Sequence, residues 1–340
     1  MRSLTLVIVS FFLLGNVSKS LAQKKYVRKN RTAPITIYGD SNMYSRGIYV
    51  DSSLIYFGSS DGSVIEYNAE EDKSKSVLKL ARRGENRDVE AYNGTLFVMQ
   101  SGDNGSVTKL TPGGGVGFIE PLEWKGVFLD ALDFNGKIGF LLGDPIDGYF
   151  TLYHTLDGGK TWSPCEGKVS AVTGEAAFAA SGSNVHIAND STYMFITGGM
   201  ASKFHKSTDN GKTWVTVDIP YYPSETTGAY SMCFADDMNG VIVGGNYKQP
   251  ELQMNTAYYT HDGGETWFNS FDPPGGYRSS VVYRNGVFYA GGHNGIDFSY
   301  DGEEWTPFAE GKYYALSIFQ GQLIATMRHG RFQSFNLINP

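Results

Sequence analysis

Arginine and carboxylate side chains recur at one place in this chain, at or near the start of short apolar segments. The residues at these starts are Arg46, Arg87, Asp88, Asp130, Glu175, Tyr230 and Arg278. Turns that follow the next apolar segment add Asp144, Asp147, His293 and His329. Guanidinium groups bind carboxylates through paired hydrogen bonds, and two carboxyl groups can act as acid and base on a glycosidic bond. If the fold gathers them, these residues offer anion binding or glycoside chemistry.

Other kinds of chemistry lack a matching motif. The six histidines, His154, His186, His205, His261, His293 and His329, show no HxxxH or HExxH spacing, so we predict no metal site. No GxGxxG follows a strand and opens a helix, and no haem or flavin signature occurs. We therefore expect no cofactor.

A repeated turn determines the expected fold. Segments 154–162, 206–214 and 259–267 nearly superimpose, and 298–305 is shorter by one residue. Each carries an Asp, a Gly and a Trp, the Asp and Trp being Asp157 and Trp162, Asp209 and Trp214, Asp262 and Trp267, and Asp301 and Trp305. Asp and Gly suit a tight turn, and Trp opens the next strand. We interpret these residues as structural.

Between the turns each unit has the same order of four strands. Seven such units can be counted, and the last lacks its outer strand because the chain ends. The segment 35–38 near the N-terminus can supply that strand and close a ring. The prediction is an all-β, seven-bladed β-propeller; six blades with an irregular extra strand is the alternative.

Propeller topology sorts the turns between two faces. Connections from an outer to the next inner strand share one face with the turns between second and third strands, and the repeated Asp turns lie on the other. The polar candidates should gather on the first face, around the central channel. They form either a ring of ion pairs lining a wet channel or a pocket for an anionic or sugar-like ligand or a peptide.

The repeated turn resembles the Asp-box, or BNR, repeat of sialidases and related propellers. Further segments, 128–134, 143–146, 174–182, 226–229 and 276–279, resemble exported bacterial BNR-like propellers related to the photosystem II stability/assembly-factor propellers. That resemblance covers about Arg46 to Trp305 and implies seven blades. Members are often labelled oxidoreductases, but it implies no photosynthetic role.

Three functions follow from these observations. The favoured one is a non-enzymatic binding or assembly propeller that captures a protein, peptide, carbohydrate or other anionic ligand, with Arg87, Asp130, Glu175 and Arg278 at the site centre. A sialidase-like hydrolase is the second, although no Phe/Tyr-Arg-Ile-Pro segment precedes the first blade. An oxidoreductase is the third, and it lacks a cofactor motif.

The N-terminus reads as an export signal. Arg2 precedes the apolar stretch 4–14, and Ala22 ends a cleavage motif, so 1–22 is a signal peptide, 23–33 a basic arm and 34–340 one domain. No apolar run long enough for a membrane span follows. From Thr32 onward the chain carries 21 basic and 35 acidic residues, a net charge of −14, which disfavours nucleic-acid binding. We expect an exported monomer in which Cys165 and Cys233 are free.

Overall fold

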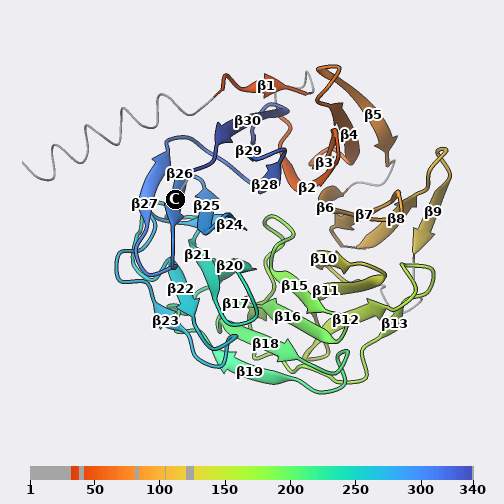
Figure 1. The fold of residues 1–340 in the computed structure, drawn as a ribbon. Helices are drawn as coiled ribbons and strands as arrows, with labels where there is room; N and C mark the ends of the chain where they lie inside the picture. The colour runs from red at the N-terminus through yellow and green to blue at the C-terminus, as the bar shows by residue number, and fades with distance from the viewer. Residues whose placement is uncertain (1–31, 38–41, 81–83, 104, 120–125, 339–340) are drawn as a thin grey trace, which may run out of the picture.

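The computed structural model describes residues 32–37, 42–80, 84–103, 105–119 and 126–338. The predicted signal peptide and most of the predicted basic arm lie outside these residues. All named elements of the described chain are β-strands, arranged as seven blades around a central opening (Figure 1). The predicted seven-bladed propeller is therefore confirmed. No helix in the described part of the chain is long and apolar enough to cross a membrane.

The first four blades follow the chain from strand to strand. Blade 1 comprises β2 (Ser45–Asp51), β3 (Leu54–Ser59), β4 (Ser63–Asn68) and β5 (Lys73–Lys79). Blade 2 comprises β6 (Glu85–Tyr92), β7 (Thr95–Ser101), β8 (Ser106–Leu110) and β9 (Val116–Ile119). Blade 3 comprises β10 (Leu129–Asn135), β11 (Ile138–Ile146), β12 (Tyr149–Thr155) and β13 (Ser163–Pro164). Blade 4 comprises β15 (Val185–Asn189), β16 (Thr192–Ile196), β18 (Lys203–Ser207) and β19 (Val215–Asp218).

The last three blades carry two additions. Blade 5 comprises β20 (Thr227–Phe234), β21 (Gly240–Asn246), β22 (Ala257–Thr260) and β23 (Phe268–Asn269), and is extended by β14 (Glu175–Ala176) and β17 (Gly198–Gly199). Blade 6 comprises β24 (Arg278–Arg284), β25 (Val287–Gly292), β26 (Gly295–Ser299) and β27 (Thr306–Ala309). Blade 7 comprises β28 (Leu316–Phe319), β29 (Gln322–Met327), β30 (Arg331–Asn336) and β1 (Ile35–Thr36).

The N-terminal strand closes the ring. Ile35 pairs with Phe332 and Thr36 with Arg331, so β1 is the outer strand of blade 7, as the sequence predicts. Ile37 is buried beside Ile55 of blade 1 and Phe332 of blade 7, which ties the two ends of the chain to adjacent blades. A closed ring leaves no inner sheet edge exposed.

The core lies between neighbouring blades. One apolar cluster joins Phe97 and Met99 of blade 2 to Leu132 and Leu141 of blade 3. The next joins Phe140 of blade 3 to Phe195 of blade 4, whose ring centroids lie 6.3 Å apart. Both faces of each sheet must therefore be apolar, which explains the near-continuous apolar runs of the middle strands.

The repeated Asp turns, called box turns below, are held by their own side chains. Asp157 accepts hydrogen bonds from the backbone amides of Lys160 and Thr161, both at 3.0 Å, and from the Thr161 hydroxyl at 2.7 Å. Burial opposes its charge, but these bonds together lower the pKa of Asp157 to about 2. Gly159 has φ +77°, and a Cβ there would meet the Phe97 ring. The Trp162 ring packs edge-on to Phe134 at 5.8 Å.

Asp262→Ala should lower the thermal midpoint by about 2–5 °C and leave ligand binding unchanged. The change removes the bonds from the Thr266 amide and hydroxyl at a turn that is largely exposed to solvent. Thermal unfolding followed by circular dichroism measures the effect. Asp262→Asn, which keeps one acceptor, should lose less, and an unchanged midpoint in the Ala variant would contradict the structural role.

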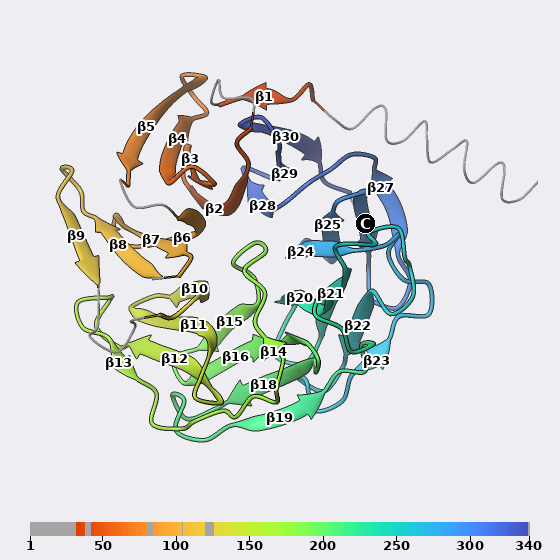
Figure 2. The same cartoon turned by 180° about the vertical axis from the view of Figure 1, so that it is seen from behind.

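One insertion enters the central opening. The segment 177–183, called the channel loop below, joins β14 to β15 and projects into the middle of the ring in both end views (Figures 1 and 2). Its Ser181 hydroxyl donates to the Ser279 carbonyl at 2.7 Å, and the Ser183 and Ser231 hydroxyls lie 2.6 Å apart. Gly182 has φ +74°, and a Cβ there would meet the Asp88 carboxylate. The loop is thus fixed to blades 5 and 6.

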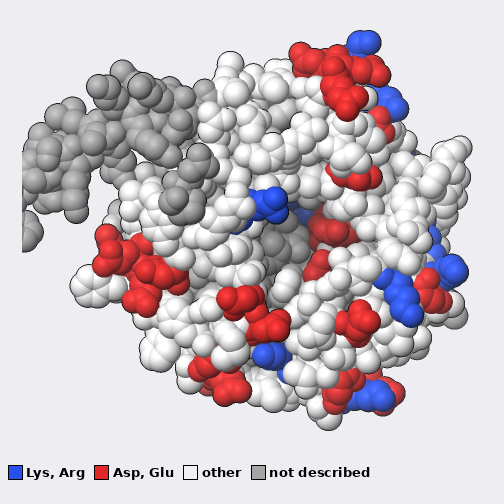
Figure 3. Space-filling model, in the orientation of Figure 1, with Lys and Arg blue, Asp and Glu red and all other residues white. Residues whose placement is uncertain are grey.

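The surface of the ring is acidic. Asp and Glu side chains gather in several groups around the ring and beside the central opening (Figure 3). The net charge of −14 from Thr32 onward agrees with this distribution. A cluster of cations on such a body is a local exception that a negatively charged group can recognise.

Candidate functional site

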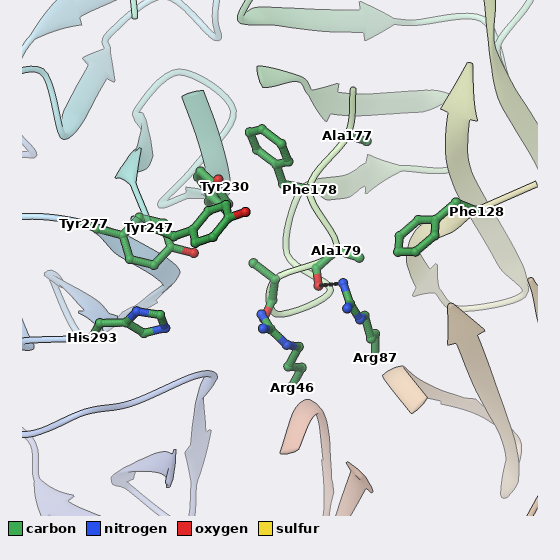
Figure 4. A pocket seen from close by; sticks show the side chains of 11 residues that line it. Arg46, Arg87, Phe128, Ala177, Phe178, Ala179, Tyr230, Tyr247, Tyr277 and His293 are labelled. Atoms are coloured by element: carbon green, nitrogen blue, oxygen red, sulfur yellow. Dashed lines mark hydrogen bonds between the residues drawn. The ribbon is translucent and has the colours of Figure 1, made fainter. Parts of the chain in front are cut away.

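The face of the ring opposite the box turns is called the box-free face below. A pocket of 320 Å³ lies on this face, at the mouth of the central channel. Its walls come from the starts of inner strands, from the second-to-third turns and from the channel loop. The lining residues are Arg46, Arg87, Phe128, Ala177, Phe178, Ala179, Ala180, Tyr230, Tyr247, Tyr277 and His293 (Figure 4). Four of the eleven residues predicted to gather on this face therefore meet here: Arg46, Arg87, Tyr230 and His293.

Arg46 and Arg87 approach the pocket from neighbouring blades. Each donates one Nη1 hydrogen bond of 3.2 Å to the channel loop, Arg46 to the Ala180 carbonyl and Arg87 to the Ala179 carbonyl (Figure 4). Arg87 also pairs with Glu85 at 2.9 Å. Within the described residues no carboxylate pairs with Arg46, and its buried Nε has no hydrogen-bond partner. Nε is too buried to reach a ligand, but the terminal nitrogens have more N–H donors than the bond to Ala180 uses, so they keep donor capacity for one.

Aromatic rings form the opposite wall. Tyr230 stacks on Phe178 with centroids 4.3 Å apart, and Tyr277 meets Tyr230 edge-on at 4.8 Å. The Tyr230 hydroxyl is occupied by the Thr226 carbonyl at 3.0 Å. Tyr230 thus offers its ring, not a free hydroxyl, to the pocket. Figure 4 shows these rings facing the two arginines across the pocket.

The sequence analysis missed two cations beside the pocket. Lys312 lies in the connection from β27 to β28, and Arg328 in the turn from β29 to β30. We call Arg46, Lys312 and Arg328 the cation cluster. Arg46 lies over the stacked rings of Tyr44 and Tyr314, 5.2 and 5.8 Å from their centroids, and Arg328 Nε donates to the Tyr314 hydroxyl at 2.7 Å. The same topological rule that selected His329 could have found its neighbour Arg328.

The cation cluster lowers the pKa of Lys312 and of the neighbouring His293. Partial burial lowers the pKa of Lys312, and repulsion from Arg328 and Arg46 adds to that effect. Burial, followed by Lys312, Arg46 and Arg328, lowers the pKa of His293 to about 4. His293 is therefore neutral at pH 7. Positive charges that repel one another at a pocket create a favourable potential for an anion.

Arg278 was predicted at the centre of the site, but it does not line the pocket. Its side chain is buried and its guanidinium forms an ion pair with Asp297 of β26 through Nε, at 2.6 Å, and Nη2. Nη1 donates to the Tyr277 carbonyl and to Asn294. A shift in register between Arg278 and Ser280 marks a bulge at this strand start. The guanidinium therefore lies within its own blade, and Arg278 does not line the pocket.

Glu175 is a second correction. It does not open an inner strand, because β14 pairs with β17 and the inner strand of blade 4 is β15. Its buried carboxylate accepts from Lys203 at 2.8 Å and Thr197 at 2.7 Å. Burial opposes the charge, yet these bonds and His205 lower the pKa of Glu175 to about 2. Glu175 and Asp144 line a separate cavity of 390 Å³ beside the channel loop.

The other predicted carboxyl groups do not line the pocket either. Asp88 is buried and accepts from the Val89 and Leu132 amides at 2.9 and 2.8 Å. Burial raises the pKa of Asp88 to about 7 and that of Asp144 to about 6. Asp130 is fully buried, and the backbone amides of Ala179 and Asp144 only partly offset the effect of burial on its carboxylate. Burial, then Asp144, raises the pKa of Asp130 well above its usual range.

The arrangement suits binding better than acid–base chemistry. Groups of three or more His, Cys, Asp or Glu able to hold a metal ion are absent from the described residues. Asp88, Asp130, Asp144 and Glu175 are buried or bound by lysine and backbone amides, and the exposed Asp147 is not a lining residue either. What the pocket presents is guanidinium donors, aromatic faces and backbone. Cys165 and Cys233 are free cysteines in different blades.

Comparisons with known proteins support the fold. The Sortilin-Vps10 family (sortilin, neurotensin receptor 3) matches residues 150–272, just over a third of the chain. No curated protein matches. A streptogramin B lyase structure has a TM-score of 0.67 at 13% identity, covering 91% of this chain and 98% of its own. The virginiamycin B lyase from Staphylococcus aureus, solved with quinupristin, has a TM-score of 0.65 at 11% identity, covering 90% and 99%.

A third similar structure is YCF48, and the sequence resembles photosystem II assembly-factor propellers. YCF48 from Cyanidioschyzon merolae has a TM-score of 0.60 at 14% identity, covering 90% of this chain and 99% of its own. At such identities these likenesses show a shared propeller and leave function to the site.

Proposed function

We propose that this protein is an exported, non-enzymatic binding or assembly propeller that captures a negatively charged group of a ligand in the channel-mouth pocket. The observation that carries the proposal is Arg46: its guanidinium lies over two tyrosine rings at a pocket, with no carboxylate partner among the described residues. Lys312 and Arg328 add positive charge around it.

The aromatic wall defines the rest of the ligand. Rings of Phe128, Phe178, Tyr230, Tyr247 and Tyr277 line the pocket, so apolar or ring-shaped groups next to the anion would be covered. Binding sites of this kind combine aromatic walls with a few fixed polar groups. The proposal does not invoke hydrolysis, because the described residues that line the pocket include no pair of carboxyl groups.

Arg46→Ala should weaken binding of the anionic group at least tenfold. A charge-assisted hydrogen bond contributes about 1.5–3 kcal/mol, and about 1.4 kcal/mol is a tenfold change. The purified full chain would be screened by surface plasmon resonance against acidic peptides, sialylated glycans and small carboxylates, and then compared with the variant.

Lys160→Ala is the matched control, because it removes an exposed cation at a box turn on the other face. Arg46→Lys should recover only part of the affinity, because an ammonium lacks the planar fork. A folded Arg46→Ala protein that binds its ligand like the wild type would refute the proposed site.

A further inference from the structure

Six large apolar side chains stand exposed on the box-free face, in the loops of blades 4 and 5 and the segment before them. They are Val172, Met200, Tyr222, Tyr247, Leu252 and Met254, and they are between 42% and 81% exposed. We call this set the apolar belt. Single exposed apolar residues are common, but a continuous group of them marks an interaction surface.

Hydrogen bonds join the loops that carry the belt. The Met200 amide donates to Gly174 at 2.9 Å, and the Ser224 amide donates to Gly199 at 3.2 Å. The Thr226 hydroxyl then reaches Asn246 at 2.9 Å. The belt residues therefore sit on loops that support one another rather than on separate mobile turns.

The belt runs directly into the pocket. Tyr247 belongs to both, and the Pro250 carbonyl in the same loop accepts from the Tyr277 amide at 2.9 Å. Arg46 of the cation cluster lines the same pocket (Figure 4). One surface thus contains the cationic pocket, with the exposed apolar belt beside it.

A free small anion could fill the pocket but would leave the apolar belt exposed to solvent. The pocket of 320 Å³ has room for a side chain or chain end, while the belt lies outside it and needs a longer partner. A flat lipid surface would cover the belt but could not bring its charge into a pocket behind Tyr247. A polypeptide segment with a carboxylate and neighbouring apolar side chains meets both requirements.

We propose that the occupant of this surface is a polypeptide segment of another protein, with a carboxylate in the pocket and apolar side chains on the apolar belt. This inference rests on the proposed function and adds the class of ligand. Burying exposed aromatic and methionine side chains would provide the affinity, and the cation cluster would fix the orientation.

The probe is a library of random 12-residue peptides displayed on phage and selected on the full chain. Selected peptides should carry Asp, Glu or a free C-terminus next to aromatic or aliphatic residues. Synthetic copies should lose at least tenfold in affinity for Arg46→Ala and at least fivefold for the double variant Tyr222→Ser/Met254→Ser, measured by fluorescence anisotropy.

Matched controls come from the opposite face. Met238 and Tyr300 are 50% and 54% exposed at turns on the box face, so Met238→Ser/Tyr300→Ser should bind like the wild type. Peptides that bind the Tyr222/Met254 variant at full strength but not Arg46→Ala would overturn the belt and leave the anion pocket standing. Binding unaffected by both would overturn the two proposals together.

Two further results would also overturn the inference. Full displacement of the selected peptides by millimolar acetate or inorganic phosphate would make a small anion the ligand. Binding of anionic phospholipid vesicles to the full chain, abolished in Tyr222→Ser/Met254→Ser, would make a membrane the partner. The inference expects neither competition nor vesicle binding.

Discussion

Arg278→Ala should lower the free energy of unfolding by about 3–5 kcal/mol, the largest effect expected of any single change discussed for this chain. The guanidinium and the Asp297 carboxylate are both 2% exposed, so removing one leaves the other buried without its partner. Urea unfolding followed by tryptophan fluorescence measures the loss. It requires no ligand.

The controls separate an unpaired charge from a lost contact. Arg278→Met/Asp297→Leu removes both charges and should recover most of the lost stability. Arg87→Ala breaks a pair whose side chains are 24% and 29% exposed, so it should cost about 1 kcal/mol or less. Equal losses in Arg278→Ala and Arg87→Ala would show that burial does not distinguish the two pairs.

The side-chain positions of these two arginines could not be predicted from the sequence. Both stand near the start of an inner strand, and the repeat pattern predicts the same face for both. Their side chains differ because Asp297, within the apolar strand β26, holds Arg278 inside its own blade. A lone carboxylate in an apolar strand was the available signal, but strand alternation does not identify its partner.

The channel loop marks a second limit. The repeat predicts the blades, their order and the closing strand, because box turns and apolar segments recur at regular spacing. The segment 174–183 departs from that spacing, and β14 joins the sheet of blade 5 instead of opening blade 4. Glu175 was therefore placed at the channel mouth, whereas Lys203 and Thr197 hold it in a neighbouring cavity.

The pocket itself is composed of residues from distant parts of the chain. Arg46 from blade 1, Tyr230 from blade 5 and His293 from blade 6 were foreseen because inner-strand starts and second-to-third turns converge on one face. Phe178 was not, because it comes from the insertion. A rule about strand order predicts which face a residue occupies, but the contents of the channel depend on the one segment that breaks the repeat.

Asp130 should make the stability of the ring depend on pH. Burial, then the charge of Asp144, raises its pKa well above its usual range. A carboxyl group with a raised pKa in the folded state contributes stability that is complete below its unfolded pKa of about 3.9. That contribution is lost as the pH rises through the folded pKa, because the buried group must then ionise or the chain must unfold.

Asp130→Asn removes this ionisation, so its unfolding free energy relative to the wild type should rise between pH 5 and pH 9. We expect a relative gain of at least about 1.4 kcal/mol, the equivalent of one pKa unit. Urea unfolding of both proteins at the two pH values measures it.

Glu175→Gln is the control. The folded pKa of Glu175 is about 2, so its contribution to stability is present above its unfolded pKa and is lost only as the pH falls toward 2. The loss in Glu175→Gln should therefore be nearly the same at pH 5 and pH 9. A constant difference between Asp130→Asn and the wild type would mean that the Asp130 carboxylate is already charged in the folded ring at pH 5.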